Sequence, residues 1–187
     1  MPRISQLLLP PLLVLALASC GPAQETPMDG NVPTETTFFD LAGYIDAETE
    51  RLTTNKITAD KTITLNGTTE AKEDVMINYK NDLRLFREAD INRPAWIEKY
   101  GSEEKQLSGS HKTTIYTALD SSLVVQRLLV EEDQGVPIRI EIDRKTGTVL
   151  SNGKHRLVYE GGKGYSVSTD QNNQFGEDID AEITVRW

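Results

Sequence analysis

Several short runs in the second half of the chain alternate apolar and polar residues, and this alternation constrains the fold more than any other feature. The run 138–143 has isoleucine at every second position and a charged residue after each one, and the run 179–187 repeats the alternation. Successive side chains of a strand point to opposite faces, so such runs predict strands with one buried and one solvent-facing side. No strand–helix–strand order is present, which favours an antiparallel sheet over a parallel one.

The expected strands are short and are separated by turn residues. Turn residues at 145–147 and at 161–164 supply hairpin connections. Seven runs are interpreted as strands, at residues 96–100, 112–119, 123–131, 137–143, 148–159, 165–170 and 179–187.

Two helices are expected before these strands. Thr37 and Asp40 match a capping box, and apolar residues at helical spacing follow, so a helix is predicted over 38–53. A second helix is predicted over 74–89. Its expected apolar stripe consists of Met76, Tyr79, Leu83 and Phe86.

Between these helices, Asn66-Gly67 separates two runs that are typical of strands, 57–65 and 68–72. Both central positions of a type I′ turn need positive φ, which asparagine and glycine accept, so this dipeptide predicts a β-hairpin. The predicted fold is therefore α+β, with two N-terminal helices and a β-hairpin packed on a curved antiparallel meander of about seven strands. Residues 37–187 are expected to form this single domain.

The only cysteine, Cys20, ends the sequence Leu17-Ala18-Ser19-Cys20 behind an apolar segment that starts at Leu7. Small residues directly before a cysteine at the end of such a segment are the pattern of a bacterial lipoprotein signal. Pro10-Pro11 interrupts the segment and makes a membrane-spanning helix a poorer interpretation. The sequence thus predicts a signal peptide at 1–19 and lipidation of Cys20, with two or three acyl chains giving lasting attachment to the membrane.

Residues 20–36 are predicted to be the lipidated cysteine and a flexible tether. Residues 21–36 contain three prolines and two glycines with little apolar content, which disfavours a folded structure. Gly21, rather than aspartate, follows the cysteine and favours the outer membrane, on its periplasmic face or at the cell surface. The formal net charge of −9 becomes one unit more negative when Arg3 leaves with the signal peptide, which argues against nucleic acid as a partner.

No catalytic constellation, metal-ligand set or cofactor motif stands out in the sequence. The two histidines, His111 and His155, have no second ligand at metal spacing, and the segment 161–164 lacks the remainder of a phosphate-binding loop. The acidic and amide-rich segment 170–178 would need glycine and glutamate where a calcium loop has them, but Phe175 and Ala181 stand there. We therefore predict no catalytic residues, no metal and no cofactor.

Four segments together resemble a family of cell-envelope lipoproteins of unknown function from Bacteroidetes-type bacteria. The resemblance covers most of the mature chain and implies a location in the cell envelope without implying an activity. The four segments are Phe39-Asp40-Leu41 with Tyr44, Lys61 to Gly67, Asp90 to Trp96, and Gly164 to Val167.

These features lead to one main hypothesis and two alternatives. The main hypothesis is a non-enzymatic binding or assembly module that is anchored by lipid and has an envelope protein or a ligand as its partner. The first alternative is a carrier that holds an apolar ligand in a half-barrel cavity between helices and sheet. The second is a hydrolase of glycans or peptidoglycan, which would need two carboxylates in one groove.

Overall fold

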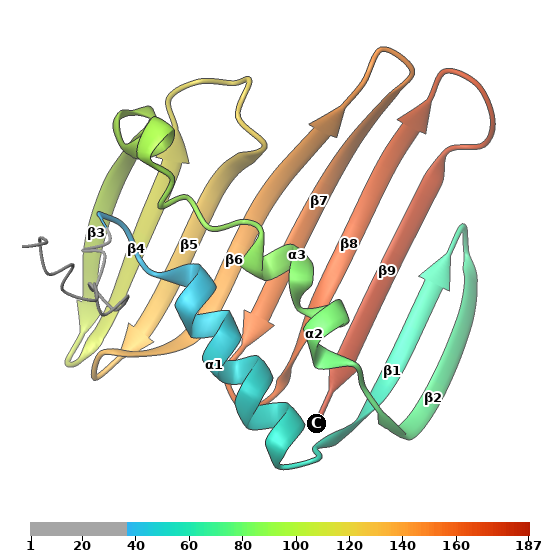
Figure 1. The fold of residues 1–187 in the computed structure, drawn as a ribbon, viewed down its shortest axis with the longest axis horizontal. Coiled ribbons are helices and arrows are strands. Elements are labelled where there is room, and N and C mark those ends of the chain that lie inside the picture. Colours follow the sequence, from blue (N-terminus) through green and yellow to red (C-terminus); the bar gives the residue numbers. More distant parts are fainter. Residues whose placement is uncertain (1–36) are drawn as a thin grey trace, which may run out of the picture. The chain divides into compact units, whose positions relative to one another are not determined.

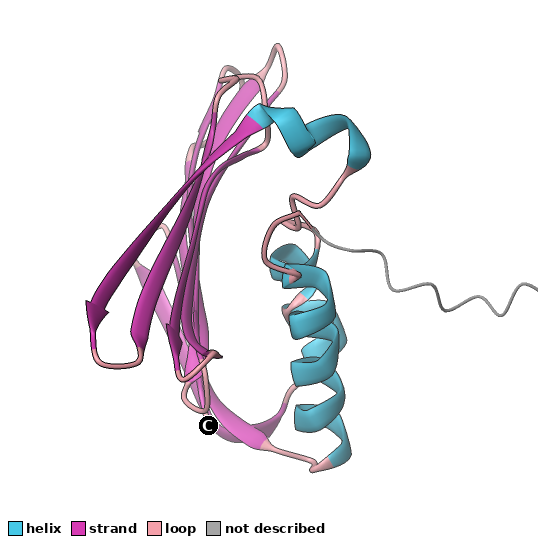
Figure 2. Cartoon of the chain, turned by 90° about the vertical axis from the view of Figure 1, so that its left-hand side faces the viewer, coloured by secondary structure: helices cyan, strands magenta, loops and turns pink. Residues whose placement is uncertain are grey.

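The computed structural model describes residues 37–187. These residues form one antiparallel sheet of nine strands, and the helices lie along one face of it (Figure 1; Figure 2). We call the face toward the helices the inner face and the opposite one the outer face. The α+β class and the antiparallel meander are confirmed, but the predicted count of about seven strands is wrong.

The strand order in the sheet is β2-β1-β9-β8-β7-β6-β5-β4-β3. Strands β3 to β9 follow one another as a meander, whereas the N-terminal hairpin β1–β2 joins the sheet beside the last strand. The bounds are β1 Thr58–Leu65, β2 Thr68–Met76, β3 Tyr100–Ser108, β4 His111–Ala118, β5 Val125–Asp133, β6 Val136–Gly147, β7 Ser151–Glu160, β8 Gly164–Asn173 and β9 Ile179–Arg186.

The first helix, α1, spans Leu41–Thr54, slightly later than the predicted 38–53. Asp40, rather than Thr37, caps it, because the Asp40 carboxylate accepts a hydrogen bond of 2.9 Å from the backbone N–H of Gly43. Leu41, Ile45 and Leu52 of α1 are buried against the sheet, as their helical spacing predicts.

The Asn66-Gly67 hairpin is present. Asn66 has φ 47° and Gly67 has φ 81°, so both turn residues adopt the left-handed conformation that the dipeptide predicts. The hairpin is not a separate unit packed on the sheet, because β1 pairs with β9 from Asp60↔Arg186 to Leu65↔Ala181. This pairing adds β1 and β2 to the seven strands of the meander and so gives the sheet its nine strands.

The second predicted helix, 74–89, is wrong in its bounds and its continuity. The chain stays in strand β2 up to Met76 and then forms two short helices, α2 at Tyr79–Asp82 and α3 at Arg84–Arg87. Strand pairing of Met76 with Thr58 holds the beginning of this segment extended, and the Asn78 side chain caps α2. Three members of the predicted stripe, Tyr79, Leu83 and Phe86, are nevertheless buried, while Met76 is exposed.

Two further predictions fail near the sheet edge and within β6. Residues 96–100 are not a strand, because Pro94–Lys99 is a 3-10 helix, η1, and the edge strand β3 begins only at Tyr100. Most of β3 is exposed and polar, so it lacks the alternation that identifies the other strands. Residues 145–147 belong to β6 rather than to a turn, which instead follows at 148–150.

Aromatic rings fill the space between the helices and the middle of the sheet. Phe86 from α3 lies 6.1 Å from the ring of Tyr159 and 5.9 Å from that of Tyr165, both on the inner face. The ring of Trp187 lies 6.2 Å from each of these two tyrosines. Tyr159, Tyr165 and Phe86 are at most 1% exposed, so this part of the interior is a packed core.

Candidate functional site

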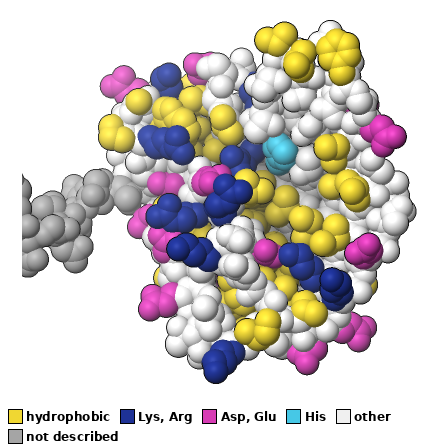
Figure 3. Space-filling view, turned by 45° about the vertical axis from the view of Figure 1, so that its right-hand side comes forward, with side chains coloured by type: hydrophobic (Ala, Val, Ile, Leu, Met, Phe, Trp, Pro, Cys, Tyr) yellow, Lys and Arg dark blue, Asp and Glu magenta, His cyan; other side chains and the backbone are white. Residues whose placement is uncertain are grey.

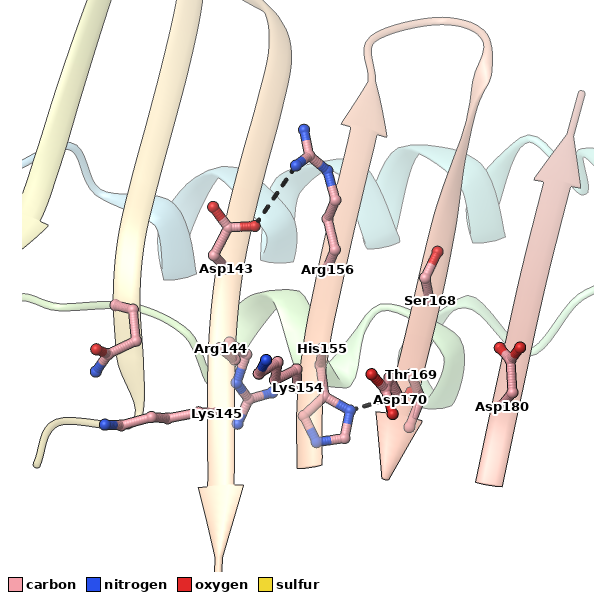
Figure 4. Close-up of a pocket in the computed structure, with 11 residues that line it drawn as sticks. Asp143, Arg144, Lys145, Lys154, His155, Arg156, Ser168, Thr169, Asp170 and Asp180 are labelled. Carbon is pink, nitrogen blue, oxygen red and sulfur yellow. Dashed lines mark hydrogen bonds and ion pairs between the residues drawn. The ribbon is translucent and has the colours of Figure 1, made fainter. Parts of the chain in front are cut away.

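The outer face of the sheet carries a depression of about 490 Å³ over strands β6 to β9. Figure 4 views it with the helices behind the sheet. Because side chains alternate along a strand, every second residue here points to the outer face. The register places on this face Asp143 and Lys145 of β6, Lys154 and Arg156 of β7, Ser168 and Asp170 of β8, and Asp180 of β9, and Gln126 of β5 adds to the lining.

Four charged residues of this depression form a single row across the sheet. Lys145 is the register partner of Lys154, Lys154 of Asp170, and Asp170 of Asp180. Two cations therefore stand side by side, followed by two carboxylates side by side. None of the salt bridges among residues 37–187 includes any of these four side chains.

A network of arginines and carboxylates borders the row. Glu141 lies 2.6 Å from Arg156, 2.8 Å from Arg139 and 3.7 Å from Arg127. Burial alone would raise the pKa of Glu141, but the hydrogen bond from Arg139 and the charges of the three guanidinium groups lower it below its usual value. Asp143 extends the network, 3.5 Å from Arg127 and 3.8 Å from Arg156. Glu141 therefore stays ionised and keeps the three arginines in place beside the depression.

His155, which lines the depression together with Arg144 and Thr169 (Figure 4), occupies a register position of the inner face and is held by two threonines. His155 Nε2 lies 3.0 Å from the Thr146 hydroxyl, and His155 Nδ1 lies 3.0 Å from the Thr169 hydroxyl. Burial, together with the nearby charge of Arg144, lowers the pKa of His155, so the imidazole is neutral at pH 7. The two hydrogen bonds hold the His155 ring between Thr146 of β6 and Thr169 of β8.

The positions of Ser168 and His155 argue against nucleophilic catalysis in the depression. Ser168 points to the outer face and His155 to the inner face, so the sheet itself separates this hydroxyl from the imidazole. The outer-face lining offers charge and hydrogen bonding for recognition. It also holds two neighbouring carboxylates, Asp170 and Asp180, so the groove contains the pair of acids that the hydrolase alternative requires.

No group of three or more histidine, cysteine, aspartate or glutamate side chains gathers at a metal site within the described residues. The segment 170–178, which sequence analysis considers as a calcium loop, is closed by its own hydrogen bonds. The backbone N–H of Asn173 donates to the Asp178 carboxylate at 2.7 Å, and the Asn173 amide donates to the Glu177 carbonyl at 2.6 Å. His111 lies at the opposite end of the sheet, 3.5 Å from Asp133.

Cys20, the one site residue that the sequence predicts, lies outside the described residues. The depression is not evident from the sequence, because the charges of the row come from four strands and only the strand register aligns them. Among the described residues, no helix is long and apolar enough to cross a membrane.

Comparison with known proteins finds no matching family model, no curated protein and no solved structure with significant similarity. The resemblance to envelope lipoproteins stays a prediction from the sequence.

Proposed function

We propose that this protein is a non-enzymatic binding module of the bacterial cell envelope, anchored by lipid on Cys20, that recognises a partner through the outer face of its sheet. The anchor is supported by Leu17-Ala18-Ser19-Cys20 at the end of an apolar segment. The recognition surface is supported by the depression over β6 to β9 and by the row of Lys145, Lys154, Asp170 and Asp180, which form no salt bridge among residues 37–187.

The single observation that carries this proposal is the order of charges in the row. Like charges directly opposite each other on neighbouring strands destabilise a sheet, and the row has two such pairs, Lys145 with Lys154 and Asp170 with Asp180. The one favourable pair in the row, Lys154 with Asp170, stands between these two unfavourable pairs. A partner that presents an anionic group to the lysines and a cationic group to the aspartates would satisfy both pairs at once.

The alternative of a carrier for an apolar ligand has less support. That function needs a cavity between the helices and the sheet. The rings of Phe86, Tyr159, Tyr165 and Trp187 pack against one another in the middle of that space. We therefore assign recognition to the outer face.

Site-specific photo-crosslinking in intact cells tests this proposal. A photoreactive residue replaces Ser168, which is exposed on the floor of the depression. The matched control replaces Ala71, which is exposed on the outer face of the edge strand β2. We expect a discrete adduct from position 168 that is absent from position 71 and that disappears when Lys154→Glu is added. The same adducts from both positions, or none from position 168, would contradict the proposal.

A further inference from the structure

Three loops at one end of the sheet expose large apolar side chains. The loop between β6 and β7 carries Val149, 93% exposed, and Leu150, 55% exposed, and the loop between β8 and β9 carries Phe175, 76% exposed. The backbone N–H of Gln174 donates to the Leu150 carbonyl at 2.8 Å, which joins these two loops. We call Val149, Leu150 and Phe175 the apolar rim. Figure 3 shows apolar side chains exposed along this end of the molecule.

The first hairpin extends the same end of the sheet. The backbone N–H of Asn66 donates to the Asp180 carbonyl at 2.8 Å, so the β1–β2 turn lies beside the β8–β9 loop. Leu65, next to that turn, is 51% exposed. The apolar side chains therefore come from neighbouring loops and are not isolated surface residues.

The two loops of the apolar rim also lack charge. Residues 146–153 and 171–176 contain no lysine, arginine, aspartate or glutamate, although 26% of the chain is charged. At the opposite end of the sheet, the loop 133–136 contains Asp133 and the loop 160–164 contains Glu160 and Lys163. Charged groups are the most costly to remove from water, so the two loops of the apolar rim can enter a non-aqueous phase at lower cost than the loops 133–136 and 160–164.

We propose that the apolar rim inserts into the interfacial region of the bilayer that holds the Cys20 lipid. This inference rests on the anchor in the proposed function. Only 16 residues, 21–36, separate Cys20 from the first described residue. Even fully extended, they span at most about 55 Å, so the domain stays within reach of the bilayer at high effective concentration.

The shape and charge of this end of the sheet indicate which kind of lipid surface the apolar rim favours. Protruding loop tips with exposed valine, leucine and phenylalanine suit a deformable lipid surface, where these side chains lie at the boundary of headgroups and acyl chains. Glu177 and Asp178 follow directly after the second charge-free segment, and the whole chain is acidic. The apolar rim therefore favours zwitterionic lipids over anionic ones.

The lipidated protein offers a direct test, because a thioether on Cys20 would leave an introduced cysteine as the only free thiol. Val149→Cys places a small polarity-sensitive fluorophore on the apolar rim. Leu107→Cys is the matched control, since Leu107 is 64% exposed at the opposite end of the sheet. Both proteins are reconstituted in vesicles of phosphatidylethanolamine and phosphatidylcholine that contain a spin-labelled quencher lipid.

We expect several-fold stronger quenching and a blue-shifted emission at position 149 relative to position 107. Adding Leu150→Ser and Phe175→Ser to the Val149→Cys protein should reduce quenching to the control level, and replacing half of the lipid by phosphatidylglycerol should weaken it. Equal quenching at positions 149 and 107, in a sample whose mass shows the lipid, would overturn this inference and leave the proposed function standing. A sample without acyl chains on Cys20 would overturn the anchor, and with it the inference.

Discussion

The two faces of the same sheet are built from different chemistry. On the inner face, Tyr159 and Tyr165 are almost fully buried against α3 and the C-terminal tryptophan. On the outer face, directly behind them, arginines and carboxylates cross the strands in rows. Each strand of the middle contributes to both faces through alternate residues, so the face that holds the fold together and the face available for recognition are separated by one backbone layer.

This difference implies that the faces respond differently to substitution. Inner-face side chains contribute apolar burial, and their removal leaves cavities. Outer-face charges divide into those that stabilise, such as Glu141 among its arginines, and those that oppose each other, such as Asp170 and Asp180. Only charges of the second kind can be changed without a loss of stability, which is the property expected of a recognition surface.

The largest contrast is expected between Tyr159→Ala and Val158→Ala, adjacent residues on opposite faces. Tyr159 is fully buried, and its removal should lower the free energy of unfolding by about 3–5 kcal/mol. Val158 is only partly buried on the outer face, and its loss should cost about 1 kcal/mol. Urea unfolding followed by circular dichroism measures both. Equal losses would mean that the inner face is not the main core.

Within the outer face, Glu141→Gln should have the next largest effect. It leaves Arg127, Arg139 and Arg156 without their shared carboxylate. The three arginine side chains are 31–55% exposed, so solvent screens their charges. The free energy of unfolding should therefore fall by only about 1–2 kcal/mol. Thermal unfolding at low and high salt measures the loss, which should shrink as salt rises. A variant as stable as the parent at low salt would show that this network does not stabilise the fold.

Acid titration compares one carboxylate from each side of the sheet. The hydrogen bond that Arg51 donates lowers the pKa of Glu48, although burial opposes this shift, and the hydrogen bond from Tyr159 lowers the pKa further. Although burial opposes the shift here too, the neighbouring arginines lower the pKa of Glu141. A lowered folded-state pKa contributes stability above the ordinary value of 4.5, and this contribution is lost as pH falls through the folded pKa. The parent should therefore lose stability below pH 4.5 more steeply than Glu48→Gln or Glu141→Gln. Parallel curves for all three proteins would contradict these directions.

The smallest expected effect has the opposite sign. Asp180→Asn removes one of two carboxylates that face each other across β8 and β9 and should raise stability by about 0.5 kcal/mol or less. The same substitution should weaken the crosslink from position 168. Differential scanning calorimetry and the crosslinking yield are measured on the same variant. A loss of stability would indicate that Asp180 has a structural role and would weaken the case for a recognition surface.

Much of the fold could be predicted because local patterns are strong in particular segments. The alternation in β6 and β9 and the positive φ of Asn66-Gly67 depend only on neighbouring residues. The split of 74–89 could not be predicted, because pairing of β2 with β1 decides where the strand ends. The edge strand β3 could not be predicted either, because it is mostly polar and exposed on both faces and lacks the alternation that identifies a strand.

The candidate site was less accessible to sequence analysis than the fold. Lys145, Lys154, Asp170 and Asp180 are unremarkable surface residues in the sequence, and only long-range register aligns them. A sequence motif reports chemistry that one segment carries, as Cys20 and its preceding residues do. A row of side chains across four strands has no such local signal.

The most direct test of the account is the intact mass of the mature protein purified from membranes in detergent. We predict a chain that begins at Cys20 and carries a diacylglyceryl group with further acylation, and that partitions into the detergent phase. An unmodified thiol on Cys20, in a chain that partitions into water, would contradict the central claim that lipid anchors this domain.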